Sequence, residues 1–174
     1  RLEPYESVQA ALAGLPEDHS LLFDPVRVTI GLLNSADHVA HREGVNPAHL
    51  FKARKNAAEL ANVRRTMEED GAALCEFFAW FESALGKETI TELTIDERIT
   101  AARARRPGFV SPSFGTIAAW QANGAMPHYH ATTEAHAVIE GNGLLLIDSG
   151  GQYLGGTTDI TRVVPVGQVT GEQK

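Results

Sequence analysis

Two strand-like runs joined by a glycine-rich segment constrain the fold of this 174-residue chain more than any other feature. The apolar run at 144–147 ends at Asp148, and the β-branched run at 157–164 contains Asp159. A Gly-Gly pair between the runs is typical of a hairpin turn, so the pattern predicts two adjacent antiparallel strands. Aspartate is depleted in strands, so the presence of one in each run needs an explanation.

Both aspartates can point to the same face of this hairpin. Asp148 and Asp159 are eleven residues apart, and residues an odd number apart can lie opposite each other in an antiparallel pair. Two carboxylates that close repel each other and lose hydration, so they need a cationic partner. A pair of divalent cations would supply it, because hard cations bind carboxylate oxygens. The alternative is that Asp148 belongs to a surface turn and Asp159 is an exposed strand residue.

Composition narrows the classes of partner. The chain is 43% apolar and 21% charged, which is typical of a globular protein, and its net charge of −7 argues against nucleic-acid binding. No apolar run approaches the ~18 residues of a membrane span. The single cysteine, Cys75, excludes an internal disulfide, so we expect a cytoplasmic protein. Its neighbours Leu74 and Phe77 predict a buried thiol.

One long helix dominates the centre of the sequence. Apolar residues recur mostly three, four and seven positions apart between 60 and 85, which predicts a helix of about 30 residues. Gly86 is expected to end it. The aromatic residues among 77–81 fall at helical spacing, so we expect them in the core rather than in a binding stripe.

A second helix and several strands follow. Thr94 and Glu97 have the spacing of a capping box and predict a helix from Thr94 to about Arg105. The basic residues near its end, Arg103, Arg105 and Arg106, are expected in solvent. Strands are predicted at 115–121, 135–139, 143–149 and 157–164.

The first part of the chain is less regular. The pattern predicts a helix at 5–14, a strand at 20–23 and another short helix after Asp24, which Pro25 follows. The polar stretch at 37–50 is interpreted as a linker. This part is too small to form a hydrophobic core by itself, so we expect it to be the end of a domain that begins earlier.

Several segments resemble the pita-bread metallopeptidases. The two aspartates and their flanks are similar to the first two metal ligands of that family. The form Tyr-x-x-Gly-Thr-Thr-Asp-x-Thr-Arg at 153–162 is most similar to the Xaa-Pro aminopeptidases, also called aminopeptidase P. The form Asn-Gly-Ala-x-x-His-Tyr at 123–129 resembles the segment that holds the family's active-site histidine, which would be His128. The departures are local, with Gly115 where the family often has proline.

The resemblance implies a fold and a site. The fold class would be α/β (α+β), with a curved antiparallel sheet and long outer helices. Residues 1–48 would be the C-terminal part of a creatinase-like domain, and residues 49–174 the first half of the catalytic domain. Asp148 and Asp159 would bind two divalent metal ions, usually Mn²⁺, with Asp159 as the bridge. His128 would hold the substrate or the developing oxyanion.

The resemblance also implies a substrate and a partner. The substrates would be peptides with proline in second position, and the full-length protein would be a homodimer. The family's remaining ligands, one His and two Glu, would follow Lys174, so this chain alone would hold two of five ligands and be inactive.

Alternatives stay open on the same fold and outside it. A prolidase-type dipeptidase or a creatinase-like hydrolase would share the aspartates, and a non-catalytic scaffold module would usually lose them. His128, His130 and Glu134 also resemble the first metal motif of the cupins, in which alternate strand residues bind one metal. No histidine follows His136 to complete the second cupin motif, so we treat this as a minor alternative.

Overall fold

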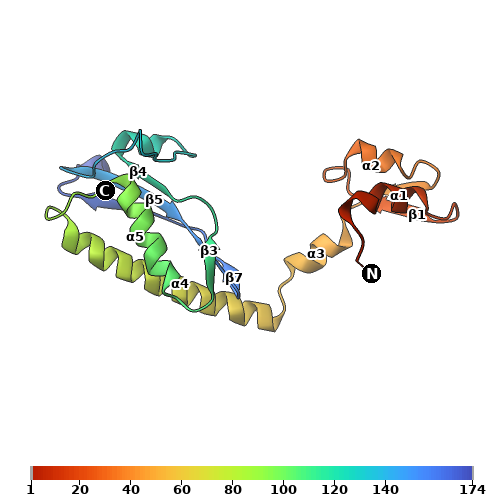
Figure 1. Cartoon of the computed structure of the whole chain (residues 1–174), viewed down its shortest axis with the longest axis horizontal. Coiled ribbons are helices and arrows are strands. Elements are labelled where there is room, and N and C mark those ends of the chain that lie inside the picture. The colour runs from red at the N-terminus through yellow and green to blue at the C-terminus, as the bar shows by residue number, and fades with distance from the viewer. Residues whose placement is uncertain (1, 174) are drawn as a thin grey trace. The chain divides into compact units, whose positions relative to one another are not determined.

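The computed structural model describes residues 2–173, and the chain forms two compact units, Arg1–Asn56 and Ala57–Lys174 (Figure 1). The sequence had suggested a division after residue 48. The units divide later because a short helix, α3 (Pro47–Ala53), groups with the first unit. Within the described range, no helix combines the length and the apolar character that crossing a bilayer requires.

The first unit contains a two-stranded parallel sheet. Its elements before α3 are η1 (Tyr5–Ser7), α1 (Val8–Ala13), β1 (Ser20–Phe23), α2 (Ile30–Asn34) and β2 (Ala40–Glu43). The predicted helix at 5–14 and strand at 20–23 are confirmed. The predicted linker at 37–50 is wrong, because it contains β2 and the start of α3. Every residue of β2 is exposed, so no apolar alternation marks it in the sequence.

The helix predicted to begin after Asp24 is also wrong. The Asp24 side chain accepts a hydrogen bond from the Val26 N–H at 3.1 Å, and its carbonyl accepts one from Val28 at 3.0 Å. These bonds close a turn, and α2 begins only after Thr29.

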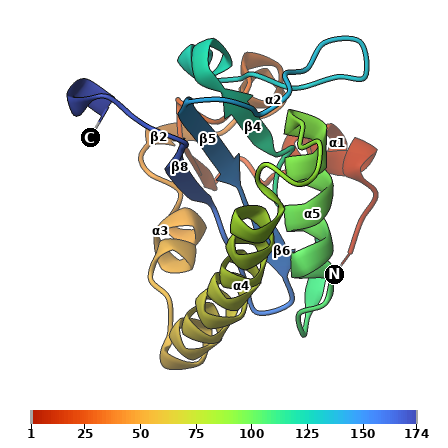
Figure 2. The ribbon, with the colours of Figure 1, turned by 90° about the vertical axis from the view of Figure 1, so that its left-hand side faces the viewer.

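The second unit packs two helices on one face of an antiparallel sheet (Figure 2). The helices are α4 (Ala57–Ala84) and α5 (Glu92–Ala104). The sheet has the order β4-β5-β8, formed by β4 (Ile117–Trp120), β5 (Gly143–Ser149) and β8 (Ile160–Val166). A second sheet has the order β3-β6-β7, formed by β3 (Phe109–Pro112), β6 (Gly151–Tyr153) and β7 (Gly156–Thr157). The short helices are η2 (Gln121–Ala125) and η3 (Gly171–Gln173).

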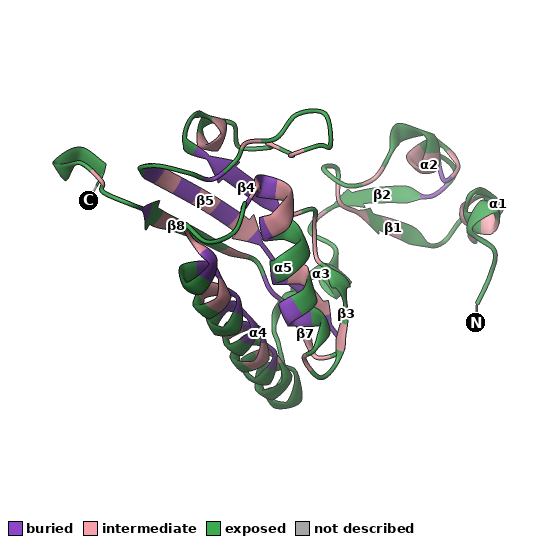
Figure 3. Cartoon of the chain, turned by 60° about the vertical axis from the view of Figure 1, so that its left-hand side comes forward, coloured by how far each residue is buried: buried purple, intermediate pink, exposed green. Residues whose placement is uncertain are grey.

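Burial alternates along β5 and distinguishes the two faces of the sheet (Figure 3). Leu145 and Ile147 are buried in the core formed with α4 and α5. Leu144, Leu146 and Asp148 are only half-buried, because successive strand side chains point to opposite faces. We call the face that carries these three residues the far face. Their partners on β8 are Pro165, Val163 and Thr161.

Both long helices are confirmed, but the start of α5 differs from the prediction. Gly86 has a φ of 72° and follows α4, as expected for a C-terminal stop. The cap of α5 is Thr91 rather than Thr94. Its Oγ1 accepts a hydrogen bond from the Thr94 N–H at 3.2 Å, and the Thr94 hydroxyl accepts one from the Thr91 N–H at 3.3 Å. The helix therefore begins at Glu92.

Two other predictions in this unit are wrong. Residues 135–139 form a single bridge between Thr91 and Val138 instead of a strand. Cys75 is exposed, although Leu74 and Phe77 beside it are buried. The core-facing positions of α4 fall three or four residues apart, and Cys75 lies outside that stripe. The aromatic residues Phe77 and Phe81 are core residues, as predicted.

Candidate metal centre

Asp148 lies on the far face, near the end of β5. In the sheet it is paired with Ile117 on one side and with Thr161 on the other. The Thr161 Oγ1 donates a hydrogen bond to Asp148 Oδ1 at 2.8 Å. This bond restrains the orientation of the carboxylate.

Asp159 immediately precedes β8 and is exposed. It is two residues before Thr161, so the strand alternation extended backwards assigns Asp159 to the far face. The residue directly opposite Asp148 is Thr161, so the two aspartates are diagonal neighbours, a relation in which cross-strand residues are ~7–8 Å apart. By this extrapolation both aspartates belong to the same face of the sheet, although they are not directly paired.

The backbone around the two aspartates is tightly held. Ser113 donates its N–H to the Gly150 carbonyl at 3.1 Å and its hydroxyl to the Thr158 carbonyl at 2.8 Å. The Thr158 N–H donates to the Gly151 carbonyl at 2.9 Å, and the Gly151 N–H donates to Thr158 Oγ1 at 2.8 Å. A Cβ on Gly150 would collide with the Thr158 carbonyl. The backbone is therefore held at Thr158, which precedes Asp159, and at Gly150, two residues after Asp148.

A buried ion pair supports the hairpin from the side of the helices. Arg103 binds Asp70 through Nε at 2.7 Å and Nη2 at 3.2 Å, and the Tyr153 hydroxyl donates to Asp70 Oδ1 at 2.8 Å. All three residues are at most 3% exposed. Burial raises the pKa of Tyr153, and its hydrogen bond to Asp70 raises it further. The prediction that Arg103 lies in solvent is wrong. Its partner Asp70 is 33 residues away in sequence, so the local pattern around Arg103 does not indicate the buried pair.

The other two arginines of that cluster are closer to the prediction. Arg105 and Arg106 both bind the carboxylate of Glu76, which is part-exposed. The hydrogen bond from Arg105 is the main cause that lowers the pKa of Glu76.

The loop that follows η2 carries His128, which is exposed. Tyr129, the next residue, donates its hydroxyl to Glu92 Oε2 at 2.7 Å. Burial raises the pKa of Tyr129 to about 12, together with the charge of Glu92. Glu92 is a fully buried carboxylate that the sequence reasoning missed. Its position in the first turn of α5 was the available signal, but the misplaced cap obscured it.

Two carboxylates on one face suit a divalent cation, because oxygen donors are what Mg²⁺, Mn²⁺ and Ca²⁺ prefer. They leave most coordination positions to other donors. Among residues 2–173, no three His, Cys, Asp or Glu side chains are grouped to hold a metal ion. His128, His130 and Glu134 therefore form no such group, and the cupin alternative is wrong.

Residues 61–174 match the profile of metallopeptidase family M24. The chain belongs to metallopeptidase family M24. The Xaa-Pro aminopeptidase 1 of Dictyostelium discoideum is 34% identical over 173 residues, which cover 97% of this chain and 27% of that protein. A probable Xaa-Pro aminopeptidase P of Arthroderma gypseum is 38% identical and covers 99% of this chain and 29% of that protein.

Solved structures share the fold of this chain. The X-prolyl aminopeptidase of Caenorhabditis elegans, described as a cytosolic enzyme with a di-nuclear active site, matches with a TM-score of 0.90 and 27% identity. The match covers 97% of this chain and 29% of that one. The prolidase of Pyrococcus furiosus shares the fold, with a TM-score of 0.72 and 19% identity, over 99% of this chain and 48% of that one. The predicted pita-bread fold and the resemblance to Xaa-Pro aminopeptidases are confirmed. The chain spans less than a third of the length of the two aminopeptidase relatives.

Proposed function

We propose that the protein containing this chain removes the N-terminal residue from peptides with proline in second position, with the help of two divalent cations. The observation that carries the proposal is that an M24 chain has Asp148 on β5 and Asp159 immediately before β8, the strand paired with β5. The names of the aminopeptidase relatives support the choice of substrate.

In this proposal Asp148 and Asp159 would hold the cations. Divalent cations supply Lewis-acid polarisation of the scissile carbonyl. The bond from Thr161 to Asp148 Oδ1 would help to orient this carboxylate. His128 holds the substrate or stabilises the negative charge that develops on the carbonyl oxygen. Proline lacks the amide N–H that ordinary peptidases engage, which is a reason for a dedicated pocket.

Three finer features belong to the same proposal. The cations are Mn²⁺, as the resemblance implies. The protein works in the cytosol, which is where the C. elegans relative is described. The full-length protein is a homodimer, and light scattering would test this directly.

The deciding experiment compares full-length variants Asp148→Asn and Asp159→Asn with Asp96→Asn, an exposed aspartate on α5. We expect the two site variants to lose bound Mn²⁺ and to lose more than ~100-fold in kcat/KM on a proline-second tripeptide. Loss of an outer-shell partner alone costs ~10–100-fold, and loss of a ligand should cost more. The Asp96 variant should match the unmodified protein. Normal turnover of Asp159→Asn would remove that residue from the mechanism.

Two further measurements separate the alternatives. Cleavage of Xaa-Pro dipeptides but not of longer peptides would favour a prolidase-type enzyme, and the absence of any cleavage with no bound metal would favour a scaffold module. The 174-residue chain titrated with Mn²⁺ by calorimetry should not bind two ions tightly, because it supplies two carboxylates to a site that takes more donors. Tight binding of two ions by this chain would contradict the proposed ligand set.

A further inference from the structure

The carboxylate of Glu92 joins the two ends of the segment that carries His128. Glu92 is 0% exposed and begins α5. Its carboxylate oxygens accept hydrogen bonds from four donors: the Trp120 N–H at 2.7 Å, Asn123 Nδ2 at 2.9 Å, the Tyr129 hydroxyl at 2.7 Å and the Ala137 N–H at 2.7 Å.

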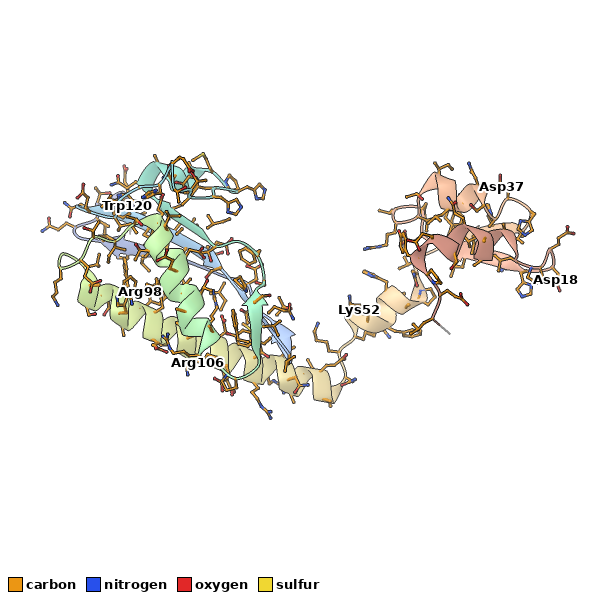
Figure 4. The ribbon with its side chains drawn as sticks, in the orientation of Figure 1. Asp18, Asp37, Lys52, Arg98, Arg106 and Trp120 are labelled. Carbon is orange, nitrogen blue, oxygen red and sulfur yellow. The ribbon has the colours of Figure 1, made fainter. Side chains whose placement is uncertain are left out.

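These donors mark where the segment leaves and rejoins the folded core. Trp120 is the last residue of β4, at the end of the sheet where η2 begins (Figure 4). Asn123 lies in η2 and also donates to the Tyr129 hydroxyl at 3.1 Å. Ala137 is at the far end of the segment, and its carbonyl accepts the Glu92 N–H at 3.1 Å. One side chain therefore closes residues 121–137 into a loop.

The charge of Glu92 is what allows a single side chain to accept all four bonds. Burial acts to raise the pKa of Glu92, but the bonds from Asn123, Trp120, Ala137 and Tyr129 outweigh burial and hold it below its usual value. An ionised carboxylate only accepts, whereas a glutamine would turn an NH₂ group towards two of the donors. At least one backbone N–H would then stay unpaired.

None of the four donors to Glu92 lies on α4, so these hydrogen bonds do not join the two helices. The packing of α4, α5 and the sheet rests on the apolar core and on the pair formed by Asp70 and Arg103. Three of the four donors lie beyond Trp120, in the segment itself or at its end, and one of them is the immediate neighbour of His128. The network is therefore placed to control the position of that histidine.

We propose that Glu92 is a positioning residue that fixes His128 relative to the sheet through Tyr129 and Asn123. The role given to His128 rests on the proposed function, whereas the anchoring of the segment does not. Loss of the anchor would let the segment move and would displace His128 without removing the two aspartates from the far face.

The first test measures the anchoring in the 174-residue chain by amide hydrogen exchange. Glu92→Gln and Tyr129→Phe should raise exchange in peptides from 121–137 by ~10-fold or more, given the strength of hydrogen bonds to a charged group. Exchange in α4 should not change. Glu97→Gln, an exposed glutamate on the same helix, is the matched control and should change neither region. Unchanged exchange in 121–137 for both variants, or equal loosening of α4, would overturn the anchoring role.

The second test asks whether the anchor acts through His128, using the full-length metal-loaded enzyme. Glu92→Gln and Tyr129→Phe should change kcat and KM in the same proportions as His128→Ala, with bound metal unchanged. Glu92→Asp keeps the charge and should restore part of the activity. The decisive variant is the double change Glu92→Gln with His128→Ala, which should be no slower than His128→Ala alone, because residues that act as a unit are not additive.

The outcomes separate this inference from the proposed function. An additive double variant, or a loosened segment with normal kcat/KM, would overturn the positioning role. A full-length protein that cleaves no proline-second peptide would defeat the proposed function, and the exchange data would still decide whether Glu92 anchors the segment.

Discussion

Removal of Arg103 is expected to destabilise the second unit strongly. Arg103→Met keeps the length of the side chain and removes its charge, which leaves the Asp70 carboxylate buried with the Tyr153 hydroxyl. Breaking a buried pair in this way costs ~3–5 kcal/mol, because a charge is left without compensation. For a unit of this size the melting midpoint falls by about 4 °C per kcal/mol, which predicts a drop of about 12–20 °C.

A double replacement tests whether the stranded charge is the cause. Asp70→Leu together with Arg103→Met replaces both charges by apolar groups, and such replacements are often neutral or stabilising by ~1–4 kcal/mol. We therefore expect the double variant to recover most of the loss. Tyr153→Phe, which removes one bond to a charged acceptor, should cost ~1.5–3 kcal/mol.

Urea unfolding followed by tryptophan fluorescence is the suitable assay. Both tryptophans, Trp80 and Trp120, lie in the second unit, so the signal reports on that unit. Arg64→Met, an exposed arginine on α4, is the control and should change stability by less than ~0.5 kcal/mol. A loss below ~1 kcal/mol for Arg103→Met, or a double variant no more stable than the single one, would refute the argument.

Three shorter predictions concern other sites. Gly150→Ala should lower the free energy of unfolding by ~1–3 kcal/mol, because its Cβ would collide with the Thr158 carbonyl. An unchanged urea midpoint would contradict this packing. Cys75 should react with a thiol reagent in the native chain, and reaction only after unfolding would show a buried thiol. Tyr129 should ionise near its raised pKa of about 12 in an absorbance titration, so its contribution to stability is present below its usual pKa of 10.0 and lost as the pH rises towards 12. Glu92→Gln should lower that midpoint, and a wild-type midpoint near 10 would show that Tyr129 is not buried against a charge.

The elements that could be predicted are those whose signal is local and repetitive. The spacing of apolar residues in α4 and the continuous apolar run of β5 determine those elements almost without help from the rest of the chain. The start of α5 could not be placed in the same way. Thr91 and Thr94 both offer a cap, and only the burial of Glu92 against the distant 121–137 segment selects the first.

For the candidate site, the sequence names residues whose role as ligands stays a prediction, and it does not give their relative geometry. The motifs pointed to Asp148 and Asp159, and the alternation of the strands assigns both to one face. Their diagonal relation depends on the register of β5 with β8, which pairs Asp148 with Thr161. The charged network beneath them was missed because Asp70 and Arg103 look like ordinary polar residues of two separate helices.

The tight support of the hairpin has a consequence for how this chain tolerates changes in length. Three positions between Asp148 and Thr161 leave little room for an inserted residue: Gly150 is enclosed, Tyr153 is buried, and a Cβ on Gly155 would lie 3.0 Å from the Thr66 hydroxyl of α4. The turn at Gly86 is the opposite case, since a Cβ there would meet nothing within 4 Å. Peptide tags and split points for reassembly experiments therefore belong in the turn between α4 and α5, where insertions meet solvent rather than the strands that carry the two carboxylates.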